Sequence, residues 1–436
     1  MPSASDWFDK FLPGIMRCRL DDLVLETPVQ GLPALSARLG VDIRVKREDL
    51  QPVFSFKLRG AYAKLQALSD ADRARGVICA SAGNHAQGVA LAARHLGISA
   101  VVVMPAVTPE IKVDAVRKLD ARVVIHGDDF EAACAHATEI AAAEDLTFIH
   151  PYDDPDVITG QGTIALELFR QCDAPPDYLF ICVGGGGLAA GMALVARYLQ
   201  PGIRIIGVEA EESASMKAAF EAGHPVTLER VGHFAEGVAV RRTGDLTFAI
   251  CHDLLDEVIT VDNDEICAAV QDVYEDTRAI AEPAGVLAIA GIKKYVENTG
   301  IRDVNLVAIN SGANINFDRL RHVAERAEVL ARIERESGAV RQGSGRPTVI
   351  IGTVGLGCVF GDTDAVLPCD IQDRFHVGRL TVEVNGDDHL GAGSDGRFEP
   401  LRIHGEALRV HVDEDRPGAD MDDGVPGRGE GHRRGD

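Results

Sequence analysis

Short apolar runs rich in β-branched residues alternate with longer alanine-rich stretches between about residues 40 and 320. The runs are nearly continuous, which is typical of parallel strands covered by helices on both faces. We predict strands at the following segments: Val41–Lys46, Gly76–Ala80, Ser99–Met104, Arg122–His126, Tyr178–Val183, Ile203–Glu209, Glu257–Val261 and Val304–Ile309. The predicted fold class is therefore α/β, with two open twisted sheets flanked by helices.

Local signals predict where two of the helices begin. The segment Thr108–Glu110 offers a capping residue, a proline for the first helical position and an acid in the first turn. The segment Asp262–Glu265 carries a similar signal. Both segments precede stretches with helical periodicity.

Composition excludes several classes of function. The chain has 436 residues and a formal net charge of −23, which argues against a nucleic-acid or anionic-membrane partner. Its nine cysteines form no C-x-x-C pair, so we expect neither a disulfide framework nor a structural metal. The first residues resemble no targeting segment, and no apolar run is long enough to span a membrane. A cytoplasmic location is expected.

The chain changes character near residue 335. No lysine follows Lys294, and residues 337–436 hold 19 of the 45 glycines. We expect the tail from about Asp413 to be disordered, because it is polar and shows little apolar periodicity. Val349–Val354 and Leu380–Val384 are candidate strands within this atypical segment, 335–436.

A glycine loop follows one of the predicted strands. Gly184–Gly187 lies between Tyr178–Val183 and the helical stretch Ala189–Leu199, where backbone N–H groups and a helix N-terminus can bind a phosphate. The same segment fits a dinucleotide fingerprint, because Glu209 ends the next strand about 20 residues further on. A nicotinamide-binding site and simple close packing of glycines remain alternatives to a phosphate site at this point.

Lys57 indicates a phosphate-bearing cofactor other than a nicotinamide dinucleotide, one that binds to a lysine amine. A Schiff base requires a lysine amine that can lose its proton, which apolar surroundings promote. Val53, Phe54, Phe56 and Leu58 provide such surroundings at the head of a predicted helix. Most lysines are solvated surface groups, so Lys57 alone is weak evidence for a cofactor site. The evidence becomes stronger when the glycine loop and the polar turns Ser81–His85 and Ser311–Asn314 are considered with it.

Together these segments resemble the fold type II pyridoxal-phosphate enzymes, and most closely the biosynthetic threonine dehydratases (threonine ammonia-lyases). The resemblance covers about residues 10–330. It is carried by segments in matching order and spacing: Lys46–Gly60, Ser81–Gly88, Gly184–Leu188, Val208–Ala214, Phe234–Val240, Glu282–Gly285 and Ser311–Asn314. It implies a tryptophan synthase β-like fold with a catalytic domain at 1–330. A smaller subdomain of about residues 50–150 and a larger one from 1–49 and 151–330 are expected.

The resemblance also implies roles for single residues. Lys57 would bind pyridoxal 5′-phosphate as a Schiff base and later move the α-proton of the substrate, with Phe56 beside the cofactor ring. Asn84 would bind the 3′-oxygen of the ring, and Ser311 would lie at the pyridine nitrogen. The phosphate would be held by the backbone of Gly184, Gly185, Gly186, Gly187 and Leu188. The substrate carboxylate would be held by the turn formed by Ser81, Ala82, Gly83, Asn84 and His85.

The activity implied is dehydration and deamination of L-threonine, and more weakly L-serine, to 2-oxobutanoate or pyruvate and ammonia, the first step of isoleucine biosynthesis. The small-molecule substrate would be bound by a homo-oligomer, either a dimer or a tetramer. Alternatives of the same fold are a hydroxyaspartate ammonia-lyase, a serine racemase and a β-replacement synthase. From other classes, a nicotinamide-binding oxidoreductase and an inactive ligand-binding relative remain.

Two departures from related families are informative. Serine racemases resemble the Ser81–His85 turn but carry a hydroxyl where Ala82 stands, so racemisation should be poor. Their divalent-metal site is incomplete here, because Ser215 stands where an acid is expected beside Glu209, and we predict no metal.

After about residue 330 the resemblance ends, and the segment 335–436 is interpreted as a replaced or degenerate regulatory domain. A frameshifted terminus and a divergent domain are both compatible with it, and we expect no response to isoleucine.

Overall fold

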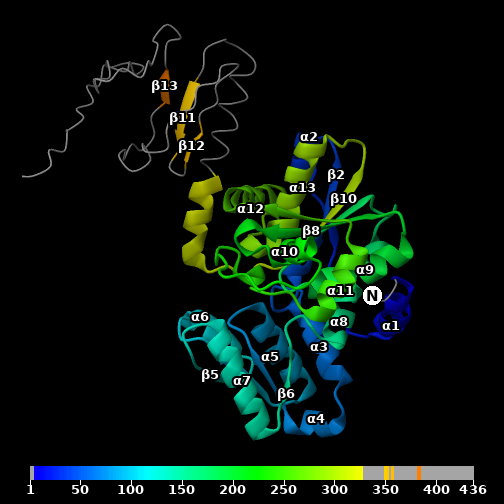
Figure 1. Ribbon diagram of the computed structural model, residues 1–436, viewed down its shortest axis with the longest axis vertical. Coiled ribbons are helices and arrows are strands. Elements are labelled where there is room, and N and C mark those ends of the chain that lie inside the picture. Colours follow the sequence, from blue (N-terminus) through cyan, green and yellow to red (C-terminus); the bar gives the residue numbers. More distant parts are fainter. Residues whose placement is uncertain (1–3, 328–347, 353–354, 358–380, 384–436) are drawn as a thin grey trace, which may run out of the picture. The chain divides into compact units, whose positions relative to one another are not determined.

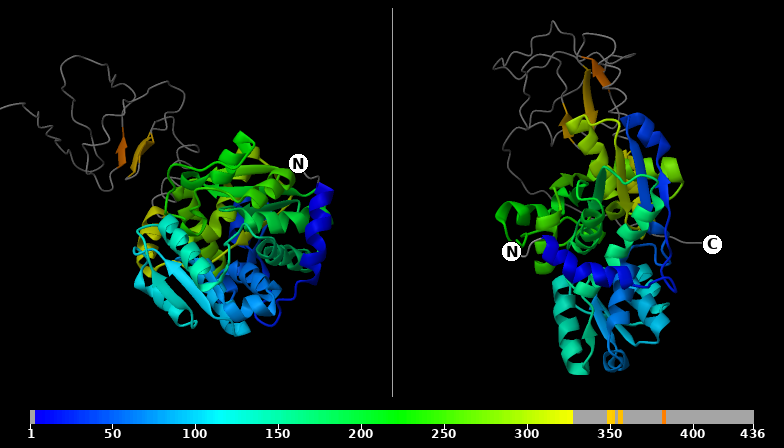
Figure 2. Two further views of the ribbon diagram at one scale, coloured as in Figure 1. Left: turned by 60° about the horizontal axis from the view of Figure 1, so that its bottom comes forward. Right: turned by 90° about the vertical axis from the view of Figure 1, so that its right-hand side faces the viewer.

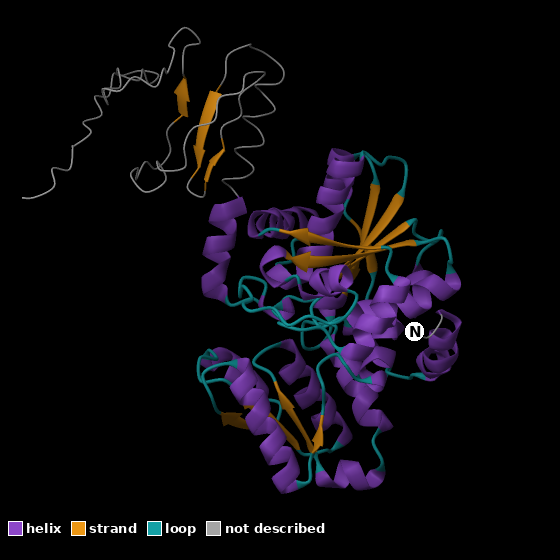
Figure 3. Cartoon of the chain, viewed as in Figure 1, coloured by secondary structure: helices purple, strands orange, loops and turns teal. Residues whose placement is uncertain are grey.

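The computed structural model describes residues 4–327 and three short segments, 348–352, 355–357 and 381–383. The chain divides into two compact units, Met1–Arg332 and Ile333–Asp436. Two sheets form within the first unit, and helices cover both faces of each, as Figure 3 shows. None of the helices in the described part of the chain is both long and apolar enough to span a membrane.

The larger sheet has six strands in the order β1-β2-β10-β7-β8-β9. All neighbouring strands are parallel except β1, which runs antiparallel to β2 at one edge. Its strands, in chain order, are β1 (Val29–Gly31), β2 (Asp42–Arg47), β7 (Tyr178–Cys182), β8 (Arg204–Ala210), β9 (Glu257–Val261) and β10 (Asn305–Asn310). Because β7 and β10 are adjacent and parallel, the polar turns that follow them lie at the same end of the sheet.

The smaller sheet has four parallel strands in the order β5-β4-β3-β6. Its strands are β3 (Val77–Ala80), β4 (Ala100–Met104), β5 (Arg122–Ile125) and β6 (Thr147–Phe148). In Figure 1 this sheet lies in the lower part of the first unit, with α5 and α7 on its two faces.

Thirteen α-helices occur in the described part of the first unit: α1 (Ala4–Arg17), α2 (Pro33–Leu39), α3 (Lys57–Ala67), α4 (Asp70–Arg75), α5 (Asn84–Leu96), α6 (Glu110–Arg117), α7 (Phe130–Glu144), α8 (Pro155–Gln171), α9 (Gly187–Leu199), α10 (Ser215–Ala222), α11 (Asp245–Leu254), α12 (Asn263–Thr277) and α13 (Leu287–Thr299). Helix α8 packs against both α3 and α9, and so connects the layers around the two sheets. The N-terminal helix α1 lies along α8 and α9 (Figure 2). Four 3₁₀ turns accompany them: η1 (Glu48–Leu50), η2 (Glu211–Ser213), η3 (Glu236–Val238) and η4 (Pro283–Val286).

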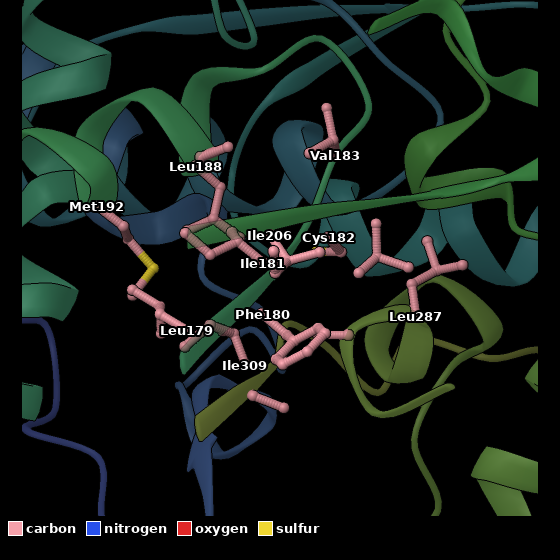
Figure 4. Close-up of a cluster of buried hydrophobic side chains, with 14 of the residues drawn as sticks. Leu179, Phe180, Ile181, Cys182, Val183, Leu188, Met192, Ile206, Leu287 and Ile309 are labelled. Atoms are coloured by element: carbon pink, nitrogen blue, oxygen red, sulfur yellow. The ribbon is translucent and has the colours of Figure 1, made fainter. Parts of the chain in front are cut away.

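The core of the larger sheet is centred on β7. Figure 4 shows Leu179 and Ile181 on the side of Met192 from α9, and Phe180 on the side of Leu287 from α13. All five side chains are fully buried. Because successive side chains of a strand point to opposite faces, a continuous apolar run is what a strand between two helical layers needs. The glycine loop thus leaves a rigid, fully covered strand.

The predicted fold class is confirmed, and each of the eight predicted strands is present with ends that differ by at most one residue. Two strands of the first unit were not predicted, β1 and β6, because they are only three and two residues long. The capping prediction at Thr108 is wrong. Helix α6 begins at Glu110, and the Thr108 hydroxyl is buried without a hydrogen-bond partner among the described atoms. At Asp262 the prediction is confirmed, because its carboxylate caps α12 in a full capping box with Glu265.

The four-stranded sheet falls within residues 50–150, and the six-stranded sheet uses residues before and after that range. The subdomain boundaries themselves stay a prediction. In the second unit, an antiparallel sheet joins β12 (Gly355–Gly357), β11 (Thr348–Gly352) and β13 (Thr381–Glu383) in that order. Both candidate strands of this segment are therefore present, whereas the tail from Asp413 lies outside the described residues.

Candidate active site

Lys57 is the first residue of α3 and is partly buried. Its amine nitrogen Nζ donates a hydrogen bond to the backbone carbonyl of Pro151 at 3.0 Å and lies 5.2 Å from the centre of the Phe56 ring. Burial lowers the pKa of Lys57 to about 8, although Cys182 and Glu282 act in the opposite direction. An appreciable fraction of the amine is therefore unprotonated near neutral pH, as a nucleophile or proton acceptor requires.

The apolar setting predicted for Lys57 is only partly correct. Val53, Phe56 and Leu58 are buried, as expected. Phe54 is not, since 56% of its surface is exposed. Its backbone adopts a left-handed conformation with φ of +56°, which turns the side chain away from the interior. The low pKa of the lysine therefore owes nothing to Phe54.

The glycine run Gly184–Leu188 connects β7 to α9 in a tight turn. Gly186 has φ of +93°, a left-handed conformation that favours glycine. A Cβ atom on Gly185 would lie 2.3 Å from the Tyr152 ring, so the backbone can pass Tyr152 only without a side chain. The first N–H groups of α9, from Gly187 onward, have no acceptor within the helix, and the helix dipole favours negative charge at this end. The loop thus offers backbone donors to an anion.

One short segment links this loop to the lysine. Pro151 accepts the hydrogen bond from Lys57, and the next residue, Tyr152, packs on the glycine loop. Thr247 fixes the loop from the other side, because its hydroxyl donates to the carbonyl of Gly185 at 2.6 Å. The amine and the phosphate-sized turn are therefore held in one rigid frame.

Asn84 begins α5 and is held by hydrogen bonds on both sides of its amide. Its Nδ2 donates to a carboxylate oxygen of Glu282 at 2.7 Å, and its Oδ1 accepts from Nδ2 of Asn314 at 2.7 Å. Asn314 also donates to the carbonyl of Val53 at 2.8 Å, which fixes the direction of the whole chain of bonds. An amide nitrogen has two N–H groups, and among the described residues Nδ2 of Asn84 donates to Glu282 alone.

Ser311 follows β10 and is buried beside the lysine segment. Its backbone carbonyl accepts a hydrogen bond from the backbone N–H of Phe56 at 3.1 Å. The hydroxyl makes a long contact of 3.4 Å to the carbonyl of Ala284 and also interacts with the thiol of Cys182. Burial raises the pKa of the neighbouring Cys182 thiol to about 11, and a hydrogen bond with Ser311 opposes this shift. The Ser311 hydroxyl is thus weakly engaged within the protein.

The turn Ser81–His85 precedes and begins α5. Ser81 accepts a hydrogen bond from the backbone N–H of Gly83 at 3.2 Å, and Ala82 contributes no polar side chain. His85 is buried, and burial lowers its pKa to about 3, so the imidazole is neutral. Its Nε2 lies 3.0 Å from the carbonyl of Ile149 and must be the protonated nitrogen that donates there. Any contact of His85 with a substrate would therefore use the backbone N–H or Nδ1.

The predicted segments are thus linked around one location, through Pro151–Tyr152, through Glu282 and Asn314, and through the bond between Phe56 and Ser311. The roles of the individual residues stay predictions. Two further residues join them that the sequence did not single out. Glu282 lies in a segment recognised only by resemblance, and burial raises the pKa of its carboxyl to about 7 against the hydrogen bond from Asn84. Tyr152 had no sequence signal, because its role depends on packing against a loop that is distant in the chain.

Glu209 does not support the nicotinamide hypothesis. Its carboxylate is fully buried and accepts two hydrogen bonds, from the backbone N–H groups of Met216 and Lys217, both at 2.8 Å. The side chain therefore fixes the start of α10 and faces no ribose site. Within the described ranges, no group of three or more potential metal ligands comes together, at Glu209 or elsewhere.

Comparison with known families decides between the remaining interpretations. Residues 20–312 match the family model described as "Pyridoxal-phosphate dependent enzyme". This chain belongs to that family. The matched range contains all the predicted cofactor and substrate residues, from Phe56 to Ser311, and pyridoxal phosphate is accordingly the cofactor.

Individual relatives are more specific. The chain is 54% identical over 320 residues to "L-threonine dehydratase biosynthetic IlvA" of Escherichia coli, a match that covers 73% of this chain and 62% of the relative. It is 50% identical over 331 residues to "Threonine dehydratase biosynthetic, chloroplastic" of Arabidopsis thaliana, covering 76% and 55%. The structure of the processed form of threonine deaminase isoform 2 from Solanum lycopersicum has a TM-score of 0.73 and 48% identity, and the match covers 74% of this chain and 94% of that one. The chain thus spans about three fifths of the length of the curated relatives.

The site fits pyridoxal phosphate on its own chemistry. It supplies a lysine amine with a lowered pKa, a glycine turn at a helix N-terminus and a buried serine hydroxyl that is weakly engaged within the protein. The glycine turn cannot accept side chains without displacing Tyr152 or Thr247. These are the groups needed for an aldehyde, a phosphate and a ring nitrogen, respectively.

The lowered pKa of Lys57 leads to a prediction about cofactor binding. The amine can attack an aldehyde only when unprotonated, so the rate of cofactor capture should rise with pH and level off above a midpoint near 8. Between pH 7 and pH 9 the rise should be about tenfold. Stopped-flow absorbance of the cofactor-free protein mixed with pyridoxal phosphate measures this. A rate that still climbs steeply above pH 9.5 would indicate an amine with its ordinary pKa of 10.5.

Proposed function

We propose that this chain dehydrates and deaminates L-threonine, and more weakly L-serine, to 2-oxobutanoate or pyruvate and ammonia. The water lost in the first step is taken up again when the released enamine hydrolyses, so ammonia is the net loss. The observation that carries the proposal is the buried, low-pKa amine of Lys57, held in one frame with the glycine turn and Asn84. The names of the relatives with about half of their residues identical point to threonine as the substrate. The proposal is consistent with a place at the first step of isoleucine biosynthesis.

Four groups would hold the cofactor. Lys57 would bind it covalently, and the backbone N–H groups of Gly184–Leu188 would hold its phosphate. The second N–H of Asn84 would reach the ring oxygen, and the Ser311 hydroxyl would reach the ring nitrogen. When bound, pyridoxal phosphate supplies the electron sink that stabilises negative charge at the α-carbon of an amino acid.

Lys57 would then act on protons. Its free amine, with a pKa near 8, can accept the α-proton of a substrate near neutral pH and return it later. The carbonyl of Pro151 holds the ammonium form by accepting a hydrogen bond from Nζ. A neutral hydroxyl such as that of Ser311 leaves the ring nitrogen largely unprotonated, which suits loss of the β-hydroxyl better than reactions that need a long-lived carbanion.

The substrate carboxylate would bind at the Ser81–His85 turn. The backbone N–H groups at the start of α5 favour an anion there, and Gly83 leaves the approach open, since a Cβ on it would meet no atom within 4 Å. His85 would not supply a charge, because its imidazole is neutral.

Product analysis tests the proposal. Purified protein with pyridoxal phosphate and L-threonine should release ammonia and 2-oxobutanoate in equal amounts, faster than it releases pyruvate from L-serine. Turnover of L-hydroxyaspartate in preference to threonine would support the ammonia-lyase alternative of the same fold. A product that keeps its amino group, formed only when a thiol is added, would support a β-replacement synthase.

A further prediction separates this activity from racemisation. Ala82 provides no acid on the face of the substrate opposite Lys57, so L-serine should not yield D-serine during a long incubation. The substitution Ala82→Ser introduces a hydroxyl in the turn and should make D-serine detectable. Chiral chromatography measures both. Appreciable D-serine from the unmodified chain would contradict the ranking of lyase above racemase.

The location, predicted from the sequence, and the assembly, predicted from the resemblance, both stay predictions. We propose a cytoplasmic homo-oligomer, either a dimer or a tetramer, that acts on a small amino acid. Light scattering coupled to size-exclusion chromatography would give the mass of the assembly, and a monomer would contradict the prediction.

A further inference from the structure

A network of four charged side chains is buried beneath the lysine segment: Lys46, Glu48, Arg59 and Glu167. Each of the four has at most 11% of its side chain exposed. The site described above makes no use of this network, although three of its residues lie in the same sequence segment as Lys57, Lys46–Gly60. Two cations and two anions leave it without net charge.

Arg59 lies at the centre of the network and is bound on two sides. Its Nε and Nη2 donate to the two carboxylate oxygens of Glu48, both at 2.8 Å. Its Nη1 and Nη2 donate to the two oxygens of Glu167, at 2.6 and 2.8 Å. Thr163 and the carbonyl of Leu25 accept further bonds at 3.2 Å. Paired bonds of this kind fix the direction as well as the distance of the guanidinium.

Arg59 and its two carboxylate partners, Glu48 and Glu167, come from elements that lie next to Lys57 or its hydrogen-bond acceptor. Arg59 is two residues after Lys57 in the first turn of α3. Glu167 belongs to α8, which begins just after the Pro151 carbonyl that accepts the lysine hydrogen bond. Glu48 lies in η1, just before the loop that leads into α3. Arg59 therefore ties together the helix that carries the amine and the helix that follows its hydrogen-bond acceptor.

Glycines bring the same helices unusually close. A Cβ on Gly160 of α8 would lie 2.5 Å from the carbonyl of Arg59, and one on Gly60 of α3 would lie 2.9 Å from the carbonyl of Val157. Close backbone contact leaves little room for α3 to shift along α8. Buried charges alone are a poor source of stability, because apolar residues of similar volume often serve as well. Beyond packing, the charged network provides directional hydrogen bonds that fix the position of α3 relative to α8.

We propose that Arg59 is a positioning residue for the cofactor lysine: its paired bonds to Glu48 and Glu167 hold the first turn of α3 against α8, and so keep the Lys57 amine enclosed at the Pro151 carbonyl. The proposal rests on Lys57 being the cofactor lysine. The network acts through position rather than charge, because it is neutral overall. The titratable groups that face Lys57 are instead Cys182, Glu282, His85 and His150.

The substitution Arg59→Lys tests the proposal, because lysine keeps the charge but cannot bind two carboxylates in pairs. A loosened α3 should admit water to Lys57, so the pH midpoint of pyridoxal phosphate capture should move upward from about 8 by about one unit. At pH 7 the rate of capture should fall by about tenfold. Stopped-flow absorbance on the full chain measures the midpoint, and thermal unfolding measures stability.

Arg47→Lys is the matched control. Arg47 is also buried and binds Asp49 through a pair of hydrogen bonds, at 2.8 and 2.7 Å, one residue before Glu48. Within the described residues its side chain makes no hydrogen bond to α3 or α8, so its loss should lower stability without moving the pH midpoint. Should Arg59→Lys fail to fold, Glu167→Gln takes its place, with a smaller shift expected in the same direction.

Folded Arg59→Lys or Glu167→Gln protein with an unchanged pH midpoint would overturn the proposal. An equal shift in Arg47→Lys would also overturn it, since any buried arginine would then have the same effect. Failure of the underlying site assignment looks different. In that case the unmodified chain itself would show no capture that depends on Lys57.

Discussion

Replacing Lys57 by alanine should abolish release of ammonia from threonine while leaving the fold intact. Among the residues of the site, this is the one amine positioned both to bind an aldehyde and to move the α-proton. The rate should fall by about 10⁴-fold or more, because proton transfer by one positioned group is itself worth about 10²–10⁴. Initial rates at saturating threonine, with circular dichroism to verify folding, measure the effect.

Lys294→Ala is the control for loss of a lysine. Lys294 lies on α13 and pairs with Glu265 at 2.9 Å, away from the site. Its replacement should leave the rate within about twofold, as for other surface changes. If Lys57→Ala kept even a few per cent of the activity, another group would be the base and the assignment of Lys57 would be wrong.

Adding a single methyl group to the glycine loop should have the second largest effect. A Cβ on Gly185 would lie 2.3 Å from the Tyr152 ring, so either the loop or the segment that holds Lys57 must move. Displacement of a binding group by about 1 Å can cost about 100-fold, and we expect Gly185→Ala to weaken pyridoxal phosphate binding by about that factor. Titration of the cofactor-free protein, followed by absorbance, gives the dissociation constant.

Gly202→Ala provides the comparison. A Cβ at Gly202 would meet no atom within 4 Å, and its backbone does not have a positive φ. Cofactor affinity should therefore be unchanged in this variant. Equal affinity in Gly185→Ala and the unmodified chain would show that the turn between β7 and α9 is not the phosphate site.

The sheets could be predicted because their strands carry a simple signal. Continuous apolar runs such as Tyr178–Val183 stand out, because helices on both faces leave few polar positions to blur the pattern. The edge strand β1 and the short strand β6 depend on pairing with partners distant in the chain, so two or three residues carry no local sign of them. Tertiary context, rather than propensity, places both.

Helix caps depend partly on the local sequence and partly on the fold around them. Asp262 caps α12 because its side chain and Glu265 bond each other's backbone N–H groups, and four neighbouring residues suffice for that. Thr108 has the same kind of signal but lies two residues before α6 begins. Its backbone N–H donates to the carbonyl of Pro105, and that of Ala106 donates to the carbonyl of Gly127. A cap predicted from sequence therefore forms only where the preceding loop also has the conformation that capping requires.

In the site, short motifs could be recognised, whereas contacts made between them could not. The Lys57 segment and the glycine loop are visible because their backbone chemistry is local. Tyr152 becomes important only because folding packs it on Gly185, and Arg59 only because Glu167 reaches it from a helix more than 100 residues away. The wrong expectation for Phe54 has the same origin, since its left-handed backbone turns an apolar residue outward.

Chemical trapping of the cofactor tests the central claim most directly. Borohydride reduction of the protein loaded with pyridoxal phosphate makes the bond between cofactor and amine permanent, and mass spectrometry of the digested chain locates it. We predict that the added mass is found on the peptide that contains Lys57 and on no other lysine. Trapping at a different lysine, or no trapped cofactor in protein that releases ammonia from threonine, would contradict the account.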